Sequence, residues 1–239
     1  MPETESELTS PDELARIERF IAAYNTIDDW IQRQLGTEQS FRSAVDLFAK
    51  RYPYWRDAES LRVFAALRNF LIHEKVRPFD YPAVPGEGAV REIEAIRERL
   101  IQPKIAGEEF AREVLTLAPG DALREALQAM VKRGFRRFPI YQDARCVGLL
   151  TERGIARYVA ELTANGRDFD AKVQIKNVLE RETKRKNYCF AAPNLAIAQI
   201  AYWFHEDTFL ETVLISQGGN DRGELIGIVT RGDVAGWSE

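Results

Sequence analysis

Three polar side chains with the chemistry to act on a phosphodiester interrupt an apolar stretch at residues 63–73, VFAALRNFLIH. An imidazole titrates near neutral pH, so His73 is suited to take a proton from a ribose 2′-hydroxyl or to protonate a leaving 5′-oxygen. Arg68 would offer a fork of donors to the phosphate, and Asn69 would orient one of these groups. On a helix Asn69 and His73 share a face, whereas Arg68 and His73 lie about 140° apart around the axis. Only the length of the Arg68 side chain would bring the three groups to one point.

The same trio also has a structural interpretation. Arg68 would pair with a carboxylate such as Asp46 or Glu74, and His73 would stabilise the end of its helix, where a positive charge is favoured. Spacing alone leaves both interpretations open.

A second polar group follows an apolar run near the C-terminus, in GIVTRGDV at residues 227–234. Thr230 and Arg231 are predicted to begin a helix, whose free backbone N–H groups attract anions. Asp233, one turn further on, offers two acceptor oxygens to a vicinal diol. In the structural alternative, Thr230 only caps the helix and Asp233 interacts favourably with its dipole, together contributing about 1 kcal/mol.

An earlier stretch at residues 148–155, GLLTERGI, repeats this pattern 79 residues upstream. Each copy follows a proline, Pro119 or Pro193, that opens an apolar-periodic helix, and the second copy is five residues longer in the loop QGGNDRGE. We therefore predict a tandem repeat of one α/β unit with the order strand, helix, strand, strand, helix. The predicted elements are residues 114–117, 123–130, 138–141, 147–150 and a helix from Glu152 in the first copy, and 188–191, 196–204, 212–215 and 225–229 in the second.

The first third of the chain predicts four helices. Ser10, Pro11 and Glu13 form a helix start with a capping box, and apolar residues at helical spacing continue to Gly36. Further helices are predicted near residues 41–52, at 57–75 and from 88 to about 105, which together give a four-helix bundle. The third helix is apolar on nearly every side, which predicts burial by the bundle core and by a partner surface.

Composition excludes several classes of protein. The first 105 residues carry 15 Lys and Arg against 18 Asp and Glu, and the remainder 18 against 19, so neither half has the basic excess of a stable nucleic-acid coat. The two cysteines cannot form a disulfide framework, and the two histidines, His73 and His205, have no cysteine cluster beside them, so no metal site is expected. The acidic start lacks a signal-peptide core and no apolar run of about 18 residues is present. A cytoplasmic protein without a membrane partner is expected.

The element Arg-x4-His, with a polar residue after the arginine and on the third helix of a small bundle, resembles the HEPN family (higher eukaryotes and prokaryotes nucleotide-binding). The resemblance covers roughly residues 12 to 105. It implies a metal-independent endoribonuclease with Arg68, Asn69 and His73 as catalytic residues. Because one histidine can hardly act as acid and base at once, it also implies a homodimer that brings two motifs together across a two-fold axis.

The repeated half closely resembles the cystathionine-β-synthase (CBS) domain, which works as a tandem pair called a Bateman module. The matching features are the Pro-led helix, the strand ending in FPIY or TVLI, and Gly-h-h-Thr-x-x-Asp at Gly227, Thr230 and Asp233, over about residues 108 to 238. The resemblance implies a pseudo-two-fold disc with clefts for adenosine-containing ligands. In it the aspartate accepts hydrogen bonds from the ribose hydroxyls and the threonine contacts phosphate.

An adenine-nucleotide site (AMP, ADP or ATP as a regulatory ligand) is thus implied in the second copy. Gly154 stands where the first copy would need its aspartate, so one occupied cleft is expected rather than two. Arg136 and Arg137 would supply charge for phosphate, or are solvated surface. The implied ligand residues are Gly227, Ile228, Thr230, Arg231 and Asp233, with Thr151, Arg153, Arg136 and Arg137 from the first copy.

The predicted fold class is α+β: an all-α bundle at residues 10–105, then a tandem pair of CBS-type α/β repeats at residues 106–239, at about 108–165 and 172–238. The predicted function is an adenine-nucleotide-sensing regulatory protein whose HEPN-like domain is an endoribonuclease controlled by the CBS pair. The alternative is a non-catalytic nucleotide-binding regulatory module with a helical dimerisation or partner-docking domain. The expected partners are a second copy in a homodimer, an adenosine nucleotide and RNA as a transient substrate, with no catalytic cofactor.

Overall fold

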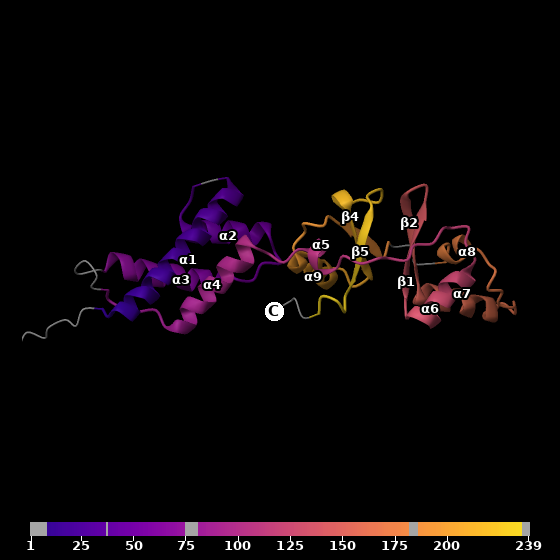
Figure 1. Ribbon diagram of the computed structural model, residues 1–239, viewed down its shortest axis with the longest axis horizontal. Coiled ribbons are helices and arrows are strands. Elements are labelled where there is room, and N and C mark those ends of the chain that lie inside the picture. The colour runs from indigo at the N-terminus through magenta and orange to yellow at the C-terminus, as the bar shows by residue number, and fades with distance from the viewer. Residues whose placement is uncertain (1–8, 37, 75–80, 182–185, 236–239) are drawn as a thin grey trace, which may run out of the picture. The chain divides into compact units, whose positions relative to one another are not determined.

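The computed structural model describes residues 9–36, 38–74, 81–181 and 186–235. The chain divides into two compact units, Met1–Pro103 and Lys104–Glu239. The first unit is helical and the second combines helices with two small sheets (Figure 1). The predicted α+β fold class is confirmed. Within the described ranges, no helix has both the length and the apolar composition needed to cross a membrane.

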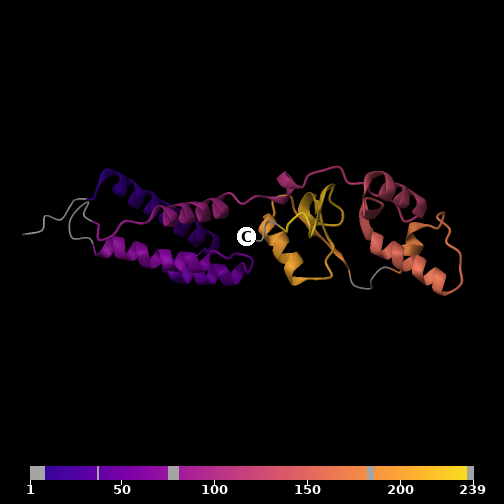
Figure 2. The same cartoon turned by 90° about the horizontal axis from the view of Figure 1, so that it is seen from below.

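The helical unit contains α1 (Pro11–Leu35), α2 (Phe41–Arg51), α3 (Ala58–His73) and α4 (Glu87–Ile101). The long helices run side by side in both views (Figure 1 and Figure 2), and α1 contacts the other three. The capping box at Ser10 is confirmed, because the Glu13 carboxylate accepts from the Ser10 backbone N–H at 2.8 Å and the Ser10 hydroxyl accepts from the Glu13 N–H. Helix α4 ends at Ile101 rather than near residue 105, since Pro103 disfavours helical backbone at the residue before it. The predicted end of the third helix at residue 75 lies outside the described residues.

Helix α3 is buried on one side only within its own chain. Leu61, Phe64 and Leu71 face the core, while Val63 is 59 % exposed and Phe70 46 % exposed. The core half of the burial prediction is thus confirmed. The partner surface stays a prediction.

The second unit contains two copies of one arrangement. In the first, α6 (Leu123–Arg133) leads to the antiparallel hairpin of β1 (Arg137–Gln142) and β2 (Arg145–Thr151), followed by α7 (Glu152–Ala164). In the second, β3 (Tyr188–Ala191) pairs in parallel with β4 (Thr212–Ser216), and β4 pairs antiparallel with β5 (Leu225–Thr230). Helix α9 (Ile197–Glu206) lies between β3 and β4 in sequence, and the inserted loop carries a 3-10 turn, η1 (Gln217–Gly219). Most predicted elements of both repeats are therefore confirmed.

The predicted strand at residues 114–117 is wrong in extent. Only Leu117 bridges β1: its N–H donates to the Pro139 carbonyl at 3.2 Å, and the Tyr141 N–H donates to the Leu117 carbonyl at 2.9 Å. The next donor along this edge of β1 would be residue 139, and a proline has no N–H. The second repeat has Leu214 at the matching position, and its parallel ladder forms from Tyr188↔Thr212 to Ala191↔Ile215.

Each repeat is completed by the segment that precedes the other one. Before the first repeat, α5 (Ala106–Glu109) packs on the second: the Ala106 N–H donates to the Leu195 carbonyl at 2.9 Å. Before the second repeat, α8 (Ile175–Leu179) packs on the first: the Ile175 N–H donates to the Asp121 carbonyl at 3.0 Å. Ala106 accordingly belongs to the core of the second repeat and Ile175 to that of the first.

Residues 231–235 form turns rather than the predicted helix start after Thr230. The Thr230 backbone N–H donates to the Asp233 carboxylate, and the Asp233 N–H donates to the Thr230 carbonyl at 3.1 Å. These bonds close a turn of four residues, 230–233. The following residues, from 236 on, lie outside the described part of the chain.

Candidate ligand site at the edge of the second repeat

The predicted pair Thr230 and Asp233 lies at the end of β5, next to the start of β4. Thr212 of β4 is paired with Thr230 of β5. The Asp233 oxygen Oδ2 accepts from both the backbone N–H and the hydroxyl of Thr230, each at 2.7 Å. The Thr230 hydroxyl therefore donates to Asp233. In the predicted structural alternative, this hydroxyl would instead accept from a helix N–H. These two bonds fix the carboxylate and use only one of its oxygens.

Two buried side chains at this end of the sheet have unsatisfied polar atoms. Thr212 is 0 % exposed and Asn187 is 5 % exposed, and neither the Thr212 hydroxyl nor the Asn187 Nδ2 has a hydrogen-bond partner in the described structure. Both lie at the same edge, because the Glu211 N–H donates to the Asn187 carbonyl at 2.8 Å. An unsatisfied buried polar group costs about 1–3 kcal/mol, so a ligand or ordered water that bonds to these atoms would recover that cost.

Sequence analysis missed Asn187 and Thr212. The available signals were a polar residue, Thr212, at the start of a buried strand, and a polar residue, Asn187, just before a partly buried one. Neither position belongs to the motif on which the site was predicted. Their importance depends on the parallel pairing of β3 with β4, which places them next to each other.

Arg112 is the third residue that sequence analysis missed. Its Nη2 donates to the Ile228 carbonyl and lies 3.6 Å from Asp233 Oδ2. Both charged side chains are partly exposed, at 47 % for Arg112 and 28 % for Asp233, so solvent screens their attraction. No local pattern could find a contact between residues so far apart in the chain.

Arg231 contacts its own protein. Its guanidinium donates to the carbonyls of Phe204, Asp207 (3.2 Å) and Leu210 (3.4 Å), and lies over the Phe204 ring. It thereby closes the C-terminal end of α9, where a cation is favoured. A role for Arg231 in ligand binding stays a prediction. To bind a ligand, its guanidinium would have to give up hydrogen bonds to these carbonyls.

Gly227 and Ile228 contribute through the backbone. A Cβ on Gly227 would lie 2.2 Å from the Phe110 carbonyl oxygen, and Gly227 bridges Ala111. The motif glycine thus leaves room for a neighbouring backbone. Ile228 offers its carbonyl to Arg112.

The first-repeat residues fall into two groups. Thr151, 2 % exposed, accepts the Gly154 N–H at 3.0 Å and caps α7, which is a structural role. Arg153 reaches the second repeat, with Nη2 3.3 Å from Glu211 Oε1. The structure therefore brings Arg153 toward the edge that holds Thr212.

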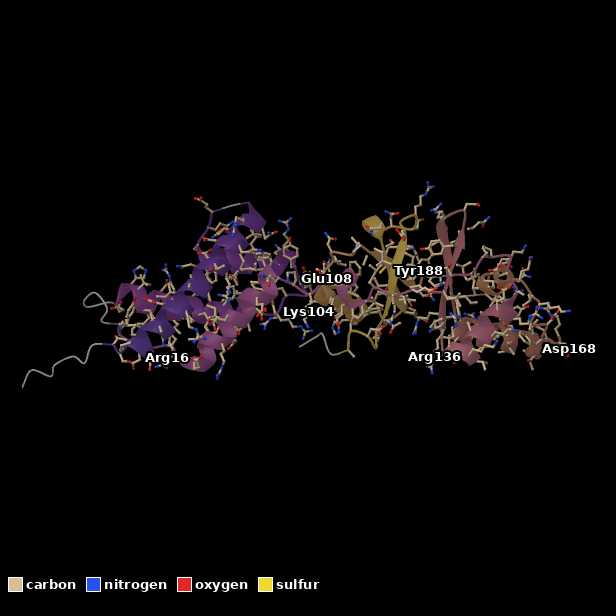
Figure 3. The ribbon with its side chains drawn as sticks, in the orientation of Figure 1. Arg16, Lys104, Glu108, Arg136, Asp168 and Tyr188 are labelled. Atoms are coloured by element: carbon tan, nitrogen blue, oxygen red, sulfur yellow. The ribbon has the colours of Figure 1, made fainter. Side chains whose placement is uncertain are left out.

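The two neighbouring arginines before and at the start of β1 differ from each other. Arg136, labelled in Figure 3, lies 3.6 Å from Glu152 within its own repeat and is largely exposed. Arg137 has a buried Nε with no hydrogen-bond partner in the described ranges. Arg137 thus has a buried donor without a partner, whereas the Arg136 side chain faces solvent.

The predicted trio on α3 is only partly brought together. Arg68 lies over the Tyr24 ring, 5.5 Å from its centroid, and its Nη1 donates to Asn69 Oδ1 at 3.4 Å. Burial raises the pKa of Tyr24 to about 12. His73 is exposed, and none of the described contacts joins it to Arg68. The structural interpretation predicted that Arg68 pairs with a carboxylate such as Asp46. The Asp46 carboxylate instead pairs with Arg62 at 2.8 Å.

In the described ranges, no three His, Cys, Asp or Glu side chains group closely enough to hold a metal ion.

Residues 107–161 match the family model of the CBS domain, and the structure repeats this arrangement between β3 and β5. The C-terminal half of the chain is a CBS domain pair. Over 123 residues the chain is 25 % identical to the CBS domain-containing protein YhcV of Bacillus subtilis, covering 52 % of this chain and 77 % of that one. The uncharacterized protein MJ1225 of Methanocaldococcus jannaschii is 24 % identical over 97 residues, which span 38 % of this chain and about a third (34 %) of its own length.

Solved CBS structures are similar to the same half. The CBS domain pair of protein MJ0100, in complex with 5-methylthioadenosine and S-adenosyl-L-methionine, is 18 % identical with a TM-score of 0.42, covering 56 % of this chain and 95 % of that one. CBSX2 in complex with AMP gives the same four values. The HEPN resemblance of the helical unit stays a prediction.

Proposed function

We propose that this chain is a regulatory protein without catalytic activity, whose CBS pair binds one adenine nucleotide at the edge formed by Asn187, Thr212, Thr230 and Asp233. The observation that carries the proposal is the partly exposed Asp233 carboxylate, which Thr230 holds through one oxygen; the unsatisfied polar atoms of Asn187 and Thr212 lie at the same end of the sheet. A carboxylate held in one orientation is suited to a polar ligand that donates hydrogen bonds to it.

The available groups match the parts of a nucleotide. The Asp233 oxygen that Thr230 does not use can accept a ribose hydroxyl, and the Asn187 amide can donate to a ring nitrogen or a phosphate oxygen. Arg112 and Arg153 bring positive charge to the same edge, which offsets the repulsion between a phosphate and the carboxylates of Asp233 and Glu211. These acceptor, donor and positively charged groups support the proposed ligand class.

A single site is proposed because the first repeat lacks its carboxylate. Gly154 occupies the position of Asp233, and its N–H is used by Thr151. A nucleoside there would find no acceptor for its diol. The expected stoichiometry is one nucleotide per chain.

Calorimetric titration with AMP, ADP and ATP tests the proposal. Wild type is expected to bind at least one of the three, and Asp233→Ala is expected to weaken that binding at least tenfold. Asp168→Ala, which removes an exposed carboxylate in the first repeat (Figure 3), serves as the matched control and should bind as wild type does. Wild type that binds none of the three nucleotides would contradict the proposal.

For the helical unit we propose dimerisation through α3. The support is the exposed apolar pair Val63 and Phe70, one face of a helix whose other face is core. Two-fold pairing of like surfaces is the commonest way in which proteins cover such a face. Analytical ultracentrifugation should find a dimer for wild type and a monomer for Val63→Ser/Phe70→Ser, whereas a monomeric wild type would leave the face to a different protein.

A second candidate function is metal-independent RNA cleavage by a HEPN-like bundle. It is favoured by the exposure of His73, which is open to a substrate. Arg68, held over Tyr24, would have to meet a His73 imidazole from another copy. Incubation of mixed labelled RNA in EDTA with wild type and His73→Ala distinguishes the two functions, because cleavage by wild type alone, leaving 2′,3′-cyclic phosphate ends, would establish the nuclease.

A further inference from the structure

The segment that enters the CBS pair from the helical unit, residues 104–112, is here named the connector. It begins with Lys104 and includes Glu108, both labelled in Figure 3. It is bonded along its length to the second repeat: the Gly107 N–H donates to the Pro193 carbonyl at 2.7 Å, and the Arg112 N–H to the Ile226 carbonyl at 3.0 Å. The connector is thus an added layer of the repeat that carries the proposed nucleotide site.

Two glycines allow this close fit. A Cβ on Gly107 would lie 2.6 Å from the Pro193 Cβ, and one on Gly227 would lie 2.2 Å from the Phe110 carbonyl oxygen. Real side chains essentially never approach so closely, so the backbones of connector and repeat are in direct contact. The end of β5 and the connector are therefore packed backbone against backbone.

The last residue of the connector touches the proposed site. Arg112 donates to the Ile228 carbonyl, two residues before Thr230, and its Nη2 faces Asp233 Oδ2 at 3.6 Å. That distance is too long for a hydrogen bond, so the guanidinium lies near the carboxylate without occupying its acceptor positions. It keeps donors available for a second anion.

We propose that Arg112 is a positioning residue that couples nucleotide binding at Asp233 to the connector. The inference rests on the proposed function. The phosphate of a bound nucleotide is a second anion that faces Arg112, in addition to the Asp233 carboxylate. The two anions together hold Arg112, and with it the connector, more firmly against β5. Because coupling between two equilibria is reciprocal, an ordered connector also strengthens nucleotide binding.

Hydrogen exchange of the connector amides measures this coupling directly. The probe is whichever of AMP, ADP and ATP binds wild type most tightly, at a saturating concentration. In wild type we expect the nucleotide to slow exchange of the amides in residues 105–112 several-fold. In Arg112→Gln we expect binding about threefold to tenfold weaker and, at saturation, connector exchange equal to that of the free protein.

Two further variants separate coupling from folding. Arg167→Gln, an exposed arginine in the first repeat, should behave as wild type in both measurements. Arg112→Lys keeps the charge but lacks the fork that reaches Ile228 and Asp233 together, so it should restore most of the affinity and little of the connector protection. Circular dichroism of each variant verifies that it is folded.

The failures are distinguishable. Nucleotide that binds wild type without changing connector exchange would overturn the coupling and leave the proposed function intact. If nucleotide slowed connector exchange in Arg112→Gln as much as in wild type, the coupling through Arg112 would also be overturned, because the connector would then respond through another contact. Absence of binding to wild type would overturn both.

Discussion

The two CBS repeats use one pattern for different purposes. Thr151 and Thr230 occupy the same position, yet the Thr151 hydroxyl accepts a backbone N–H and the Thr230 hydroxyl donates to a carboxylate. The cause is the residue three positions on, Gly154 in the first repeat and Asp233 in the second. One side chain thus changes a helix cap into part of a candidate ligand site. A repeated sequence motif is therefore better evidence for a repeated backbone structure than for a repeated ligand site.

The edges of the repeats also differ in charge. Where β1 begins with Arg137 after Arg136, β4 begins with Thr212 after Glu211. Arg153 from the first repeat and Glu211 from the second join the two edges through an ion pair. The repeats have therefore become complementary to each other as well as similar.

The largest predicted contrast concerns the motif glycines. Gly227→Ala would force a Cβ against the Phe110 carbonyl, and we expect it to lower the free energy of unfolding of the CBS pair by about 3 kcal/mol. Gly148→Ala meets only the flexible end of Leu179 at 3.3 Å, so its cost should stay below about 1 kcal/mol. Urea unfolding of both variants measures the difference, and equal costs would show that the connector yields easily.

The threonines should separate stability from binding. Thr151→Ala removes the cap of α7 and should cost about 1 kcal/mol of stability without changing nucleotide affinity. Thr230→Ala should instead weaken nucleotide binding, because Asp233 loses one of the bonds that orient it. Thermal unfolding and calorimetric titration of both variants test this. A loss of nucleotide affinity in Thr151→Ala would contradict a purely structural role for Thr151.

A smaller effect is expected for the ion pair between the repeats. Arg153→Gln should destabilise the CBS pair by about 0.5 kcal/mol, since the arginine is largely exposed while Glu211 is mostly buried. Unfolding in low and in 1 M salt should show the difference shrinking as salt screens the pair. Arg157→Gln, which removes an exposed pair within α7, is the control, and its loss should not exceed that of Arg153→Gln.

The two cysteine thiols should both be unreactive at neutral pH. Burial raises the pKa of Cys146, and it raises the pKa of Cys189 to about 11. A thiol whose pKa is raised by folding favours the folded state below its unfolded pKa, about 8.5, and this contribution is lost as the pH rises toward 11. Both should react slowly with iodoacetamide at pH 8 and faster toward pH 11. Rapid alkylation of either at pH 8 would show that its thiol is accessible.

Local pattern was sufficient for most of the fold. Capping residues and helical periodicity gave the four helices of the first unit, and internal repetition gave the strands of the second. The strand at residues 114–117 failed because Pro139 lacks the N–H that its ladder needs, an effect visible only once the partner strand is known. The helix start predicted at Thr230 and Arg231 is a turn over residues 231–235, although the bond from the Thr230 N–H to the Asp233 carboxylate is of the kind that begins α1 at Ser10 and Glu13.

The candidate site was predictable only in its motif. Asn187, Thr212 and Arg112 enter it through strand pairing and through the connector, and these contacts join residues far apart in sequence. Periodicity and motif spacing report on neighbours along the chain, so neither contains this information. Side-chain direction was equally out of reach, as Arg68 shows by lying over Tyr24 rather than beside His73.

The exchange of α5 and α8 between the repeats has a consequence for synthesis. Ala106 and Phe110 belong to a core whose other members, such as Ile197 and Val229, are made about a hundred residues later. Until then these apolar residues have no partner on the growing chain. The second repeat can therefore close its core only after residues up to Val234 have left the ribosome, and the slow step of folding should be this late, long-range closure.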